Sequence, residues 1–225
     1  MAIAMTFVLS AGEIDLSVGS VAGLATVTVA MAIAIAGPIA GVFAGLATGL
    51  VVGMFNGWLT TRVGIPSFLT TLAMMGIAKG AAMWISDTAA VPILNQSYAW
   101  IFGGGSIGRI PVLLFWVLIL GAIGHFALRR TGFGRRVLAT GGGETAARYS
   151  GIDTARIKFR VLVLSSTAAA LAGMLYAGRL QSGRFQLGEG DELSVIAAAV
   201  LGGTSLFGGK GTVIGTVVGA MMIGM

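Results

Sequence analysis

The stretch from Leu16 to Thr61 runs for 46 residues without one charged side chain. A helix needs about 20 apolar residues to cross a bilayer, so this stretch predicts two spanning helices in succession. Gly37-Pro38 is the turn signal near its middle, and we expect helices at about 17–36 and 39–59. Because backbone polar groups in the bilayer core must be bonded within the protein, such a chain is expected to be an all-α polytopic membrane protein.

The rest of the chain repeats this pattern and narrows the class of function. Apolar stretches predict helices at about 67–84, 110–128 and 161–178, and a broken one over 193–225. Charged residues make up 10% of the chain, against about 25% in soluble domains. With no cysteine and one histidine, neither a thiolate or multi-histidine metal site nor a catalytic constellation is expected. We predict no cofactor and no nucleic-acid partner, because no basic run is interleaved with aromatic residues.

The segment 129–160 carries eight of the fourteen lysine and arginine residues. Basic residues accumulate in the cytoplasmic loops of membrane proteins, so we assign this segment to the cytoplasm. Alternation along the chain then places loops 86–109 and 179–190 outside, and Arg62 and Lys210 inside. Residues 1–225 are predicted to form part of a single transmembrane domain, a multi-helix bundle.

Two ladders of glycine at intervals of four suggest an internal repeat. They are Gly45, Gly49, Gly53 and Gly57 in the first half, and Gly211, Gly215 and Gly219 in the second. Each follows a break that contains Gly and Ser, at 14–20 and at 203–209. Transporters are often built from repeats with broken helices near the substrate path. Close packing of helices through small residues explains the ladders equally well, and both interpretations stay open.

Polar residues near the breaks are the candidates for a substrate path. A carboxylate at membrane depth is costly and is a functional candidate by default, which singles out Glu13 and Asp15. For Asp15 we favour a structural role, capping the helix that starts near Ser17. For Asn56 we favour a hydrogen bond between helices over a role in the path. The candidate set is Asp15, Ser17, Asn56, Thr204 and Ser205.

Residues 142–152, GGETAARYSGI, predict a short helix inside the basic segment. Glu144 suits the positive end of a helix dipole, and Arg148 stands four residues on, where it can pair with Glu144. Ser150-Gly151 is a helix stop. A helix of one or two turns is marginal alone and needs a partner surface. The alternative is an amphipathic loop that rests on lipid headgroups.

Three stretches carry a resemblance to a known family. Residues 14–20 (IDLSVGS) resemble its GIDLSVGS segment, residues 142–152 its GGNxxAARxSGI segment, and residues 198–212 (AAVLGGTSLFGGKGT) its AVVLGGTSLFGGxGT segment. The family is the permease subunit of bacterial ABC importers for ribose, xylose and galactose. The resemblance spans nearly the whole chain.

The resemblance implies an alternating-access permease in the bacterial inner membrane. Its implied partners are an ABC ATPase on the cytoplasmic side, an extracytoplasmic sugar-binding protein and a second permease subunit, identical or not. The residues implied to couple the permease to the ATPase are Glu144, Ala146, Ala147, Arg148, Ser150 and Gly151.

The chain departs from the family pattern at two positions. Glu13 stands where the family usually has Gly, and Gly143 where it usually has Asn. Family members are also longer, so we expect a helix ahead of Met1 and further helices beyond Met225 to be missing here. Two alternatives remain: an ion-coupled secondary transporter or channel that uses Glu13 and Asp15, and a branched-chain amino-acid ABC permease, whose cytoplasmic loop is differently patterned.

Overall fold

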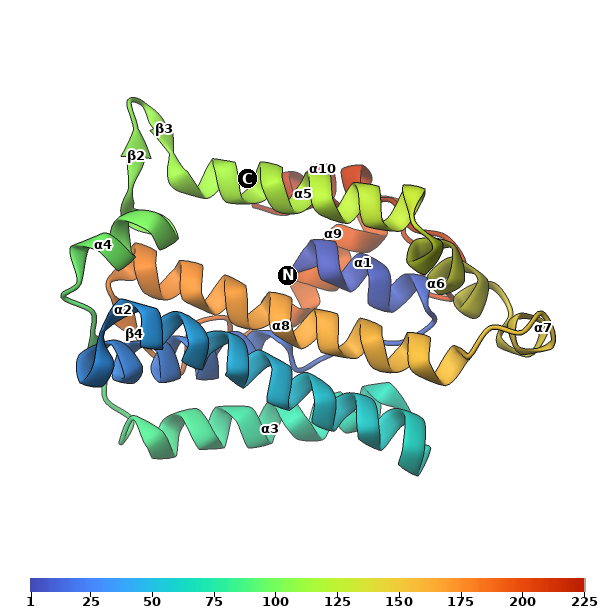
Figure 1. The fold of residues 1–225 in the computed structure, drawn as a ribbon, viewed down its shortest axis with the longest axis horizontal. Coiled ribbons are helices and arrows are strands. Elements are labelled where there is room, and N and C mark those ends of the chain that lie inside the picture. The colour runs from blue at the N-terminus through green and yellow to red at the C-terminus, as the bar shows by residue number, and fades with distance from the viewer. Residues whose placement is uncertain (225) are drawn as a thin grey trace.

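A computed structural model describes residues 1–224 and is mainly helical (Figure 1). Along the chain the elements are α1 (Ala2–Ser10), α2 (Val18–Trp58), η1 (Leu59–Val63), α3 (Ser67–Ile85), β1 (Val91–Pro92), α4 (Gln96–Ala99), η2 (Trp100–Gly104), β2 (Ser106–Ile107), β3 (Ile110–Pro111), α5 (Val112–Arg130), α6 (Gly132–Gly142), α7 (Glu144–Tyr149), α8 (Thr154–Leu180), β4 (Ser182–Gly183), α9 (Asp191–Leu201) and α10 (Val213–Ile223). Within these residues, four helices are long and apolar enough to cross a membrane: Val18–Val63, Ser67–Ile85, Val112–Arg130 and Thr154–Leu180.

The predicted turn at Gly37 is confirmed, and it folds α2 into a hairpin. Gly37 has φ 84° and ψ 179°, a backbone conformation that L side chains rarely adopt. The two arms pack along each other, as the hydroxyl groups of Thr28 and Thr48 show by lying 3.0 Å apart. Near the open end, the Asn56 amide donates to the Ser17 hydroxyl at 3.2 Å. The first of the four long apolar segments therefore supplies two antiparallel helices.

Helix α8 occupies the centre of the bundle, between α2 and α1 (Figure 1). The first glycine ladder is the surface on which it packs. A Cβ atom added to Gly49 would lie 2.6 Å from the carbonyl oxygen of Ser166, and one added to Gly53 would lie 2.7 Å from the Cα atom of Val163. Glycine is required at these positions because the backbones approach this closely. The ladder thus serves close packing, as one of the two interpretations held.

The second half of the chain also contains a helix, a break and a helix. Helices α9 and α10 flank the break at 202–212 and pack on each other and on α1. The hydroxyl groups of Thr6 in α1 and Thr216 in α10 lie 2.8 Å apart. The amide of Gly209, inside the break, donates to the carbonyl of Ser10 at the end of α1. The ladders differ in placement, since the first lies on the second arm of α2 and the second runs from the end of the break into α10.

The predicted loops have more structure than the sequence indicated. Val91 pairs with Gly183 in a two-stranded antiparallel ladder, so the two loops predicted to be external, 86–109 and 179–190, meet at one end of the bundle. Segment 86–109 also contains α4 and η2. The predicted boundaries of 129–160 were wrong at both ends. Helix α5 extends to Arg130, and α8 begins at Thr154 because the Asp153 side chain caps it by accepting from the amide of Arg156.

Candidate functional site

Helix α7 is the short helix predicted inside the basic segment, and it projects at one end of the molecule, opposite β4 (Figure 1). Ala147 is its buried residue, whereas Thr145, Ala146, Arg148 and Tyr149 are exposed. The predicted stop is confirmed: Gly151 has φ 81°, and its amide donates to the carbonyl of Arg148. The helix thus presents an exposed face and rests on one buried alanine.

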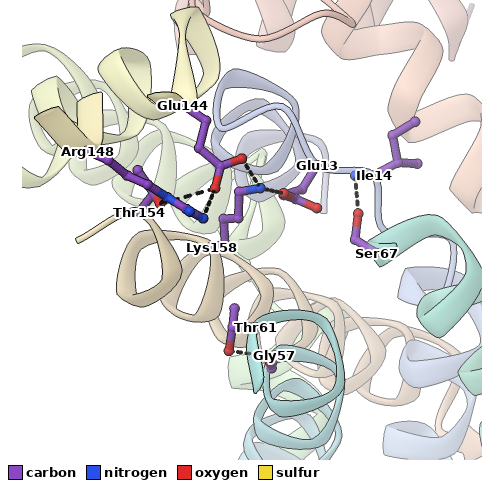
Figure 2. Close-up of polar contacts among 9 residues, drawn as sticks. All are labelled: Glu13, Ile14, Gly57, Thr61, Ser67, Glu144, Arg148, Thr154 and Lys158. Atoms are coloured by element: carbon purple, nitrogen blue, oxygen red, sulfur yellow. Dashed lines mark hydrogen bonds and ion pairs between the residues drawn. The ribbon is translucent and has the colours of Figure 1, made fainter. Parts of the chain in front are cut away.

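A chain of ion pairs ties α7 to the rest of the protein. Figure 2 shows these ion pairs next to the segment that contains Glu13 and Ile14. The predicted pair between Glu144 and Arg148 is present, with Nη2 2.6 Å from Oε1. Thr154, the first residue of α8, accepts from Arg148 Nε at 2.9 Å and donates to Glu144 at 3.2 Å. Lys158 of α8 then binds the other oxygen of Glu144 at 2.8 Å and the carboxylate of Glu13 at 2.7 Å.

The electrostatics of Glu144 follow from these contacts. The hydrogen bond from Lys158 and its positive charge, together with the bonds from Thr154 and Arg148, lower the pKa of the Glu144 carboxyl below its ordinary value, although burial opposes them. Glu144 therefore stays ionised at neutral pH and keeps its two cationic partners. Its side chain is 36% exposed, so solvent weakens these interactions.

The first break was predicted at 14–20, and the structure places it at 11–17, between α1 and α2. It brings together three of the predicted path residues. Asp15, Ser17 and Asn56 are all fully buried. Asp15 Oδ1 accepts from the amide of Ser17 at 2.9 Å and from its hydroxyl at 2.6 Å. Ser17 also accepts from Asn56, which links the break to the second arm of α2. We had predicted that Asp15 caps the helix that starts near Ser17. The N-cap position of α2 is Ser17 itself, whose side chain makes no capping hydrogen bond, and Asp15 instead accepts from the amide and hydroxyl of Ser17.

Side chains from α3 bond the backbone of this break. The amide of Ile14 donates to the Ser67 hydroxyl at 3.1 Å (Figure 2). The amide of Leu16 donates to the Thr71 hydroxyl at 3.0 Å. Irregular backbone at membrane depth is tolerated where protein groups satisfy it. Within residues 1–224, Asp15 Oδ2 and Asn56 Oδ1 are buried without a hydrogen-bond partner. The break is therefore an acceptor-rich polar centre inside an apolar bundle.

Thr204 and Ser205 lie in the second break, and the structure does not bring them to the first. The Thr204 hydroxyl accepts from the amide of Thr212 at 3.4 Å. The Ser205 hydroxyl accepts from the amide of Phe207 at 3.1 Å. Both side chains thus stabilise the turn in which they stand. Within residues 1–224 there is also no cluster of three acidic or histidine side chains able to hold a metal ion.

Sequence reasoning missed the contact that joins the two predicted regions. Lys158 lies in the basic segment, where it was one positive charge among eight. Glu13 was noticed as a departure from a family pattern and as a costly carboxylate. The costly carboxylate was itself the signal, because a buried acid needs a cation, but no spacing rule identifies a partner 145 residues away.

Comparison with known proteins decides the family. The model of a family described as branched-chain amino acid transport system, permease component, matches residues 1–225. The chain belongs to this permease family. The ribose import permease protein RbsC of Bacillus subtilis is 41% identical over 226 residues, which cover 100% of this chain and 70% of the relative. No solved structure matches the chain.

Two further relatives have the same extent of similarity. The inner membrane ABC transporter permease protein YjfF of Escherichia coli is 38% identical, over 100% of this chain and 70% of the relative. The L-arabinose ABC transporter permease protein AraH of Azospirillum brasilense is 39% identical, over 100% of this chain and 66% of the relative. The predictions of a multi-pass inner-membrane protein and of an ABC importer permease are confirmed. The permease is a transporter component and not an enzyme, and permeases of this kind work with a separate ATPase and a binding protein.

Proposed function

We propose that this permease carries a monosaccharide across the inner membrane by alternating access, driven by ATP hydrolysis on a separate subunit. The observation that carries the substrate class is the similarity to relatives named as ribose and L-arabinose permeases, at about 40% identity over the full chain. The family description names branched-chain amino acids, which makes them the second candidate substrate. An ion-coupled secondary transporter is no longer a candidate.

The proposed ATPase contact is α7 with its flanking residues: Glu144, Ala146, Ala147, Arg148, Ser150 and Gly151. Its projection from the bundle supports this assignment, because a helix of six residues needs a partner surface to be stable. The exposed Ala146 offers a flat surface, while the Glu144–Arg148 pair and Thr154 hold the orientation of the helix. The end of the bundle that carries α7 is proposed to be cytoplasmic, since α7 lies within the basic segment.

The proposed path runs past the first break. Asp15, Ser17 and Asn56 are polar, mutually bonded and buried among apolar helices, which fits a polar lining that opens when the helices move. Thr204 and Ser205 remain candidates from the second break. We also propose an extracytoplasmic sugar-binding protein and a second permease subunit as partners, because two permease halves enclose the path in the resembled family.

The test is purification from native membranes in mild detergent, mass spectrometry of the bound proteins, and uptake by the reconstituted complex. We expect an ATPase to co-purify, and ATP-dependent uptake of ribose or arabinose in preference to leucine. Replacing Glu144 and Arg148 by Ala should release the ATPase. The matched control replaces Lys79 and Glu189, an exposed ion pair outside this segment, and should retain it. Preference for leucine would overturn the sugar assignment, and an intact complex after the Glu144 and Arg148 replacements would overturn the docking site.

A further inference from the structure

Lys158 is the shared partner of two carboxylates that are far apart in the sequence. Its Nζ atom lies 2.7 Å from Glu13 in the first break and 2.8 Å from Glu144 at the start of α7. Within residues 1–224, Lys158 alone among the cations binds two acids (Figure 2). We propose that Lys158 and Glu13 are positioning residues that transmit the movement of α7 to the first break. This inference rests on the proposed function, in which a separate ATPase moves α7.

The burial of Glu13 and of most of Lys158 makes the link between them effective. The Glu13 side chain is 8% exposed and that of Lys158 is 21% exposed, so water and salt screen this pair weakly. With Arg148, the cluster contains two acids and two bases and is neutral overall. A displacement of Glu144 then has two outcomes for Lys158. The ammonium group follows Glu144 and leaves the buried Glu13 without a cation, or it stays with Glu13 and opposes the displacement.

Either outcome couples the position of α7 to the state of the break, because the break is held from the other side. Ile14 and Leu16, on either side of Asp15, are bonded through their amides to Ser67 and Thr71 of α3. A pull on Glu13 therefore acts against a fixed neighbour, and the segment between them contains Asp15. Asp15 bonds to Ser17, and Ser17 bonds to Asn56 on the second arm of α2. The link thus ends in the proposed path.

The link is a property of this chain and goes beyond the family pattern, because Glu13 stands where the resembled family usually has Gly. The placement of Lys158 on α8 also explains why its side chain reaches the break. Lys158, Leu162 and Ser165 recur at intervals that place them on one face of the helix. Leu162 and Ser165 are buried, and Lys158 reaches the break from the same helix. Lys158 therefore stands where the face of α8 that enters the core meets the segment that carries α7.

The test measures the number of ATP molecules hydrolysed per sugar imported by the reconstituted complex. Residues in a coupling network change coupling by roughly 2- to 30-fold. We expect Glu13→Gln and Lys158→Met each to raise the ratio within that range. The double variant should match the singles, because both substitutions break the same link between α7 and the first break. Lys79→Met, which breaks the exposed pair with Glu189, is the matched control and should leave the ratio unchanged. Unchanged ratios in both single variants, or additive effects in the double variant, would overturn the inference.

A second readout separates transmission from simple structural support. The chain has no cysteine, so a single spin label can be attached through Leu16→Cys. In the otherwise unaltered complex, ATP should change the mobility of this label. In the Glu13→Gln background, the label should keep its nucleotide-free mobility and lose the response to ATP. A response that persists would overturn the inference alone, whereas a parent complex without ATP-dependent uptake would overturn the proposed function and the inference with it.

Discussion

Each of the two breaks separates a pair of helices, but the contacts that hold them differ. The first, at 11–17, is held by side chains from α3 and α8 and contains two buried carboxylates. The second, at 202–212, is held largely by its own backbone and by close contact with α6, through Gly208 and Gly209. The first break is therefore connected to parts of the protein that move in the proposed mechanism. The second depends on backbone contacts, with the end of α1 through Gly209 and Ser10 and with the end of α6.

The largest expected effect is the loss of the cation at the first break. Lys158→Met leaves the buried Glu13 carboxylate unpaired, and we expect the free energy of unfolding in detergent to fall by about 3 kcal/mol. The double variant with Glu13→Gln should recover much of that loss, since no buried charge remains. Denaturant unfolding of the parent protein, of Lys158→Met and of the double variant measures these differences in the free energy of unfolding. Equal losses in the single and double variants would show that packing and not charge is responsible.

At the second break we expect a smaller effect that depends on the backbone. Gly209 has φ 76°, and a Cβ atom there would lie 2.8 Å from the Cα atom of Gly142 in α6. Gly209→Ala should therefore lower the free energy of unfolding by about 2 kcal/mol. Gly64→Ala is the matched control, because Gly64 has φ 85° and no atom within 4 Å of its added Cβ. The difference between the losses of unfolding free energy at Gly209 and at Gly64 measures the contact with α6. Equal losses would refute that contact.

The hydrogen bonds of the two breaks provide a narrower comparison. Ser67→Ala removes the acceptor of the Ile14 amide, and a buried unsatisfied donor costs about 1–2 kcal/mol. Thr204→Val removes an acceptor at the longer distance of 3.4 Å, so we expect a loss below about 1 kcal/mol. Thermal unfolding of both variants in one detergent makes the comparison. A larger loss at Thr204 would reverse our view of which break depends on side chains.

The smallest effect is the acid response of α7. The pKa of Glu144 is lowered from its ordinary value of 4.5, so this group adds stability above pH 4.5 and loses it as the pH falls through its lowered pKa. A spin label at Thr145→Cys should become more mobile in that acid range and not above it. The same label in a Glu144→Gln background should lack this step. A step above pH 4.5 would mean that Glu144 is destabilised as an anion.

The sequence predicted what depends on neighbours along the chain. The hairpin turn at Gly37, the Glu144–Arg148 pair and the stop at Gly151 all rest on spacings of one to four residues, and all three are confirmed. The contacts of Lys158 with Glu13 and of Ile14 with Ser67 join residues that only the folded bundle brings together. No periodicity encodes them. The basic segment was drawn as one loop because charge marked its ends, whereas the Asp153 cap determines where α8 begins.

The hairpin of α2 also bears on how the chain enters the membrane during synthesis. Its tip, Ala36-Gly37-Pro38-Ile39, has no charged or hydrogen-bonding side chain, and Ile35 and Ile39 are 83% and 72% exposed there. Carrying this tip across a bilayer therefore has none of the cost that a charge would impose. The arms hold no basic residue to orient them, so the first topological signal after the hairpin is Arg62. Within residues 1–62, a basic residue that could orient the hairpin is therefore made only after both arms.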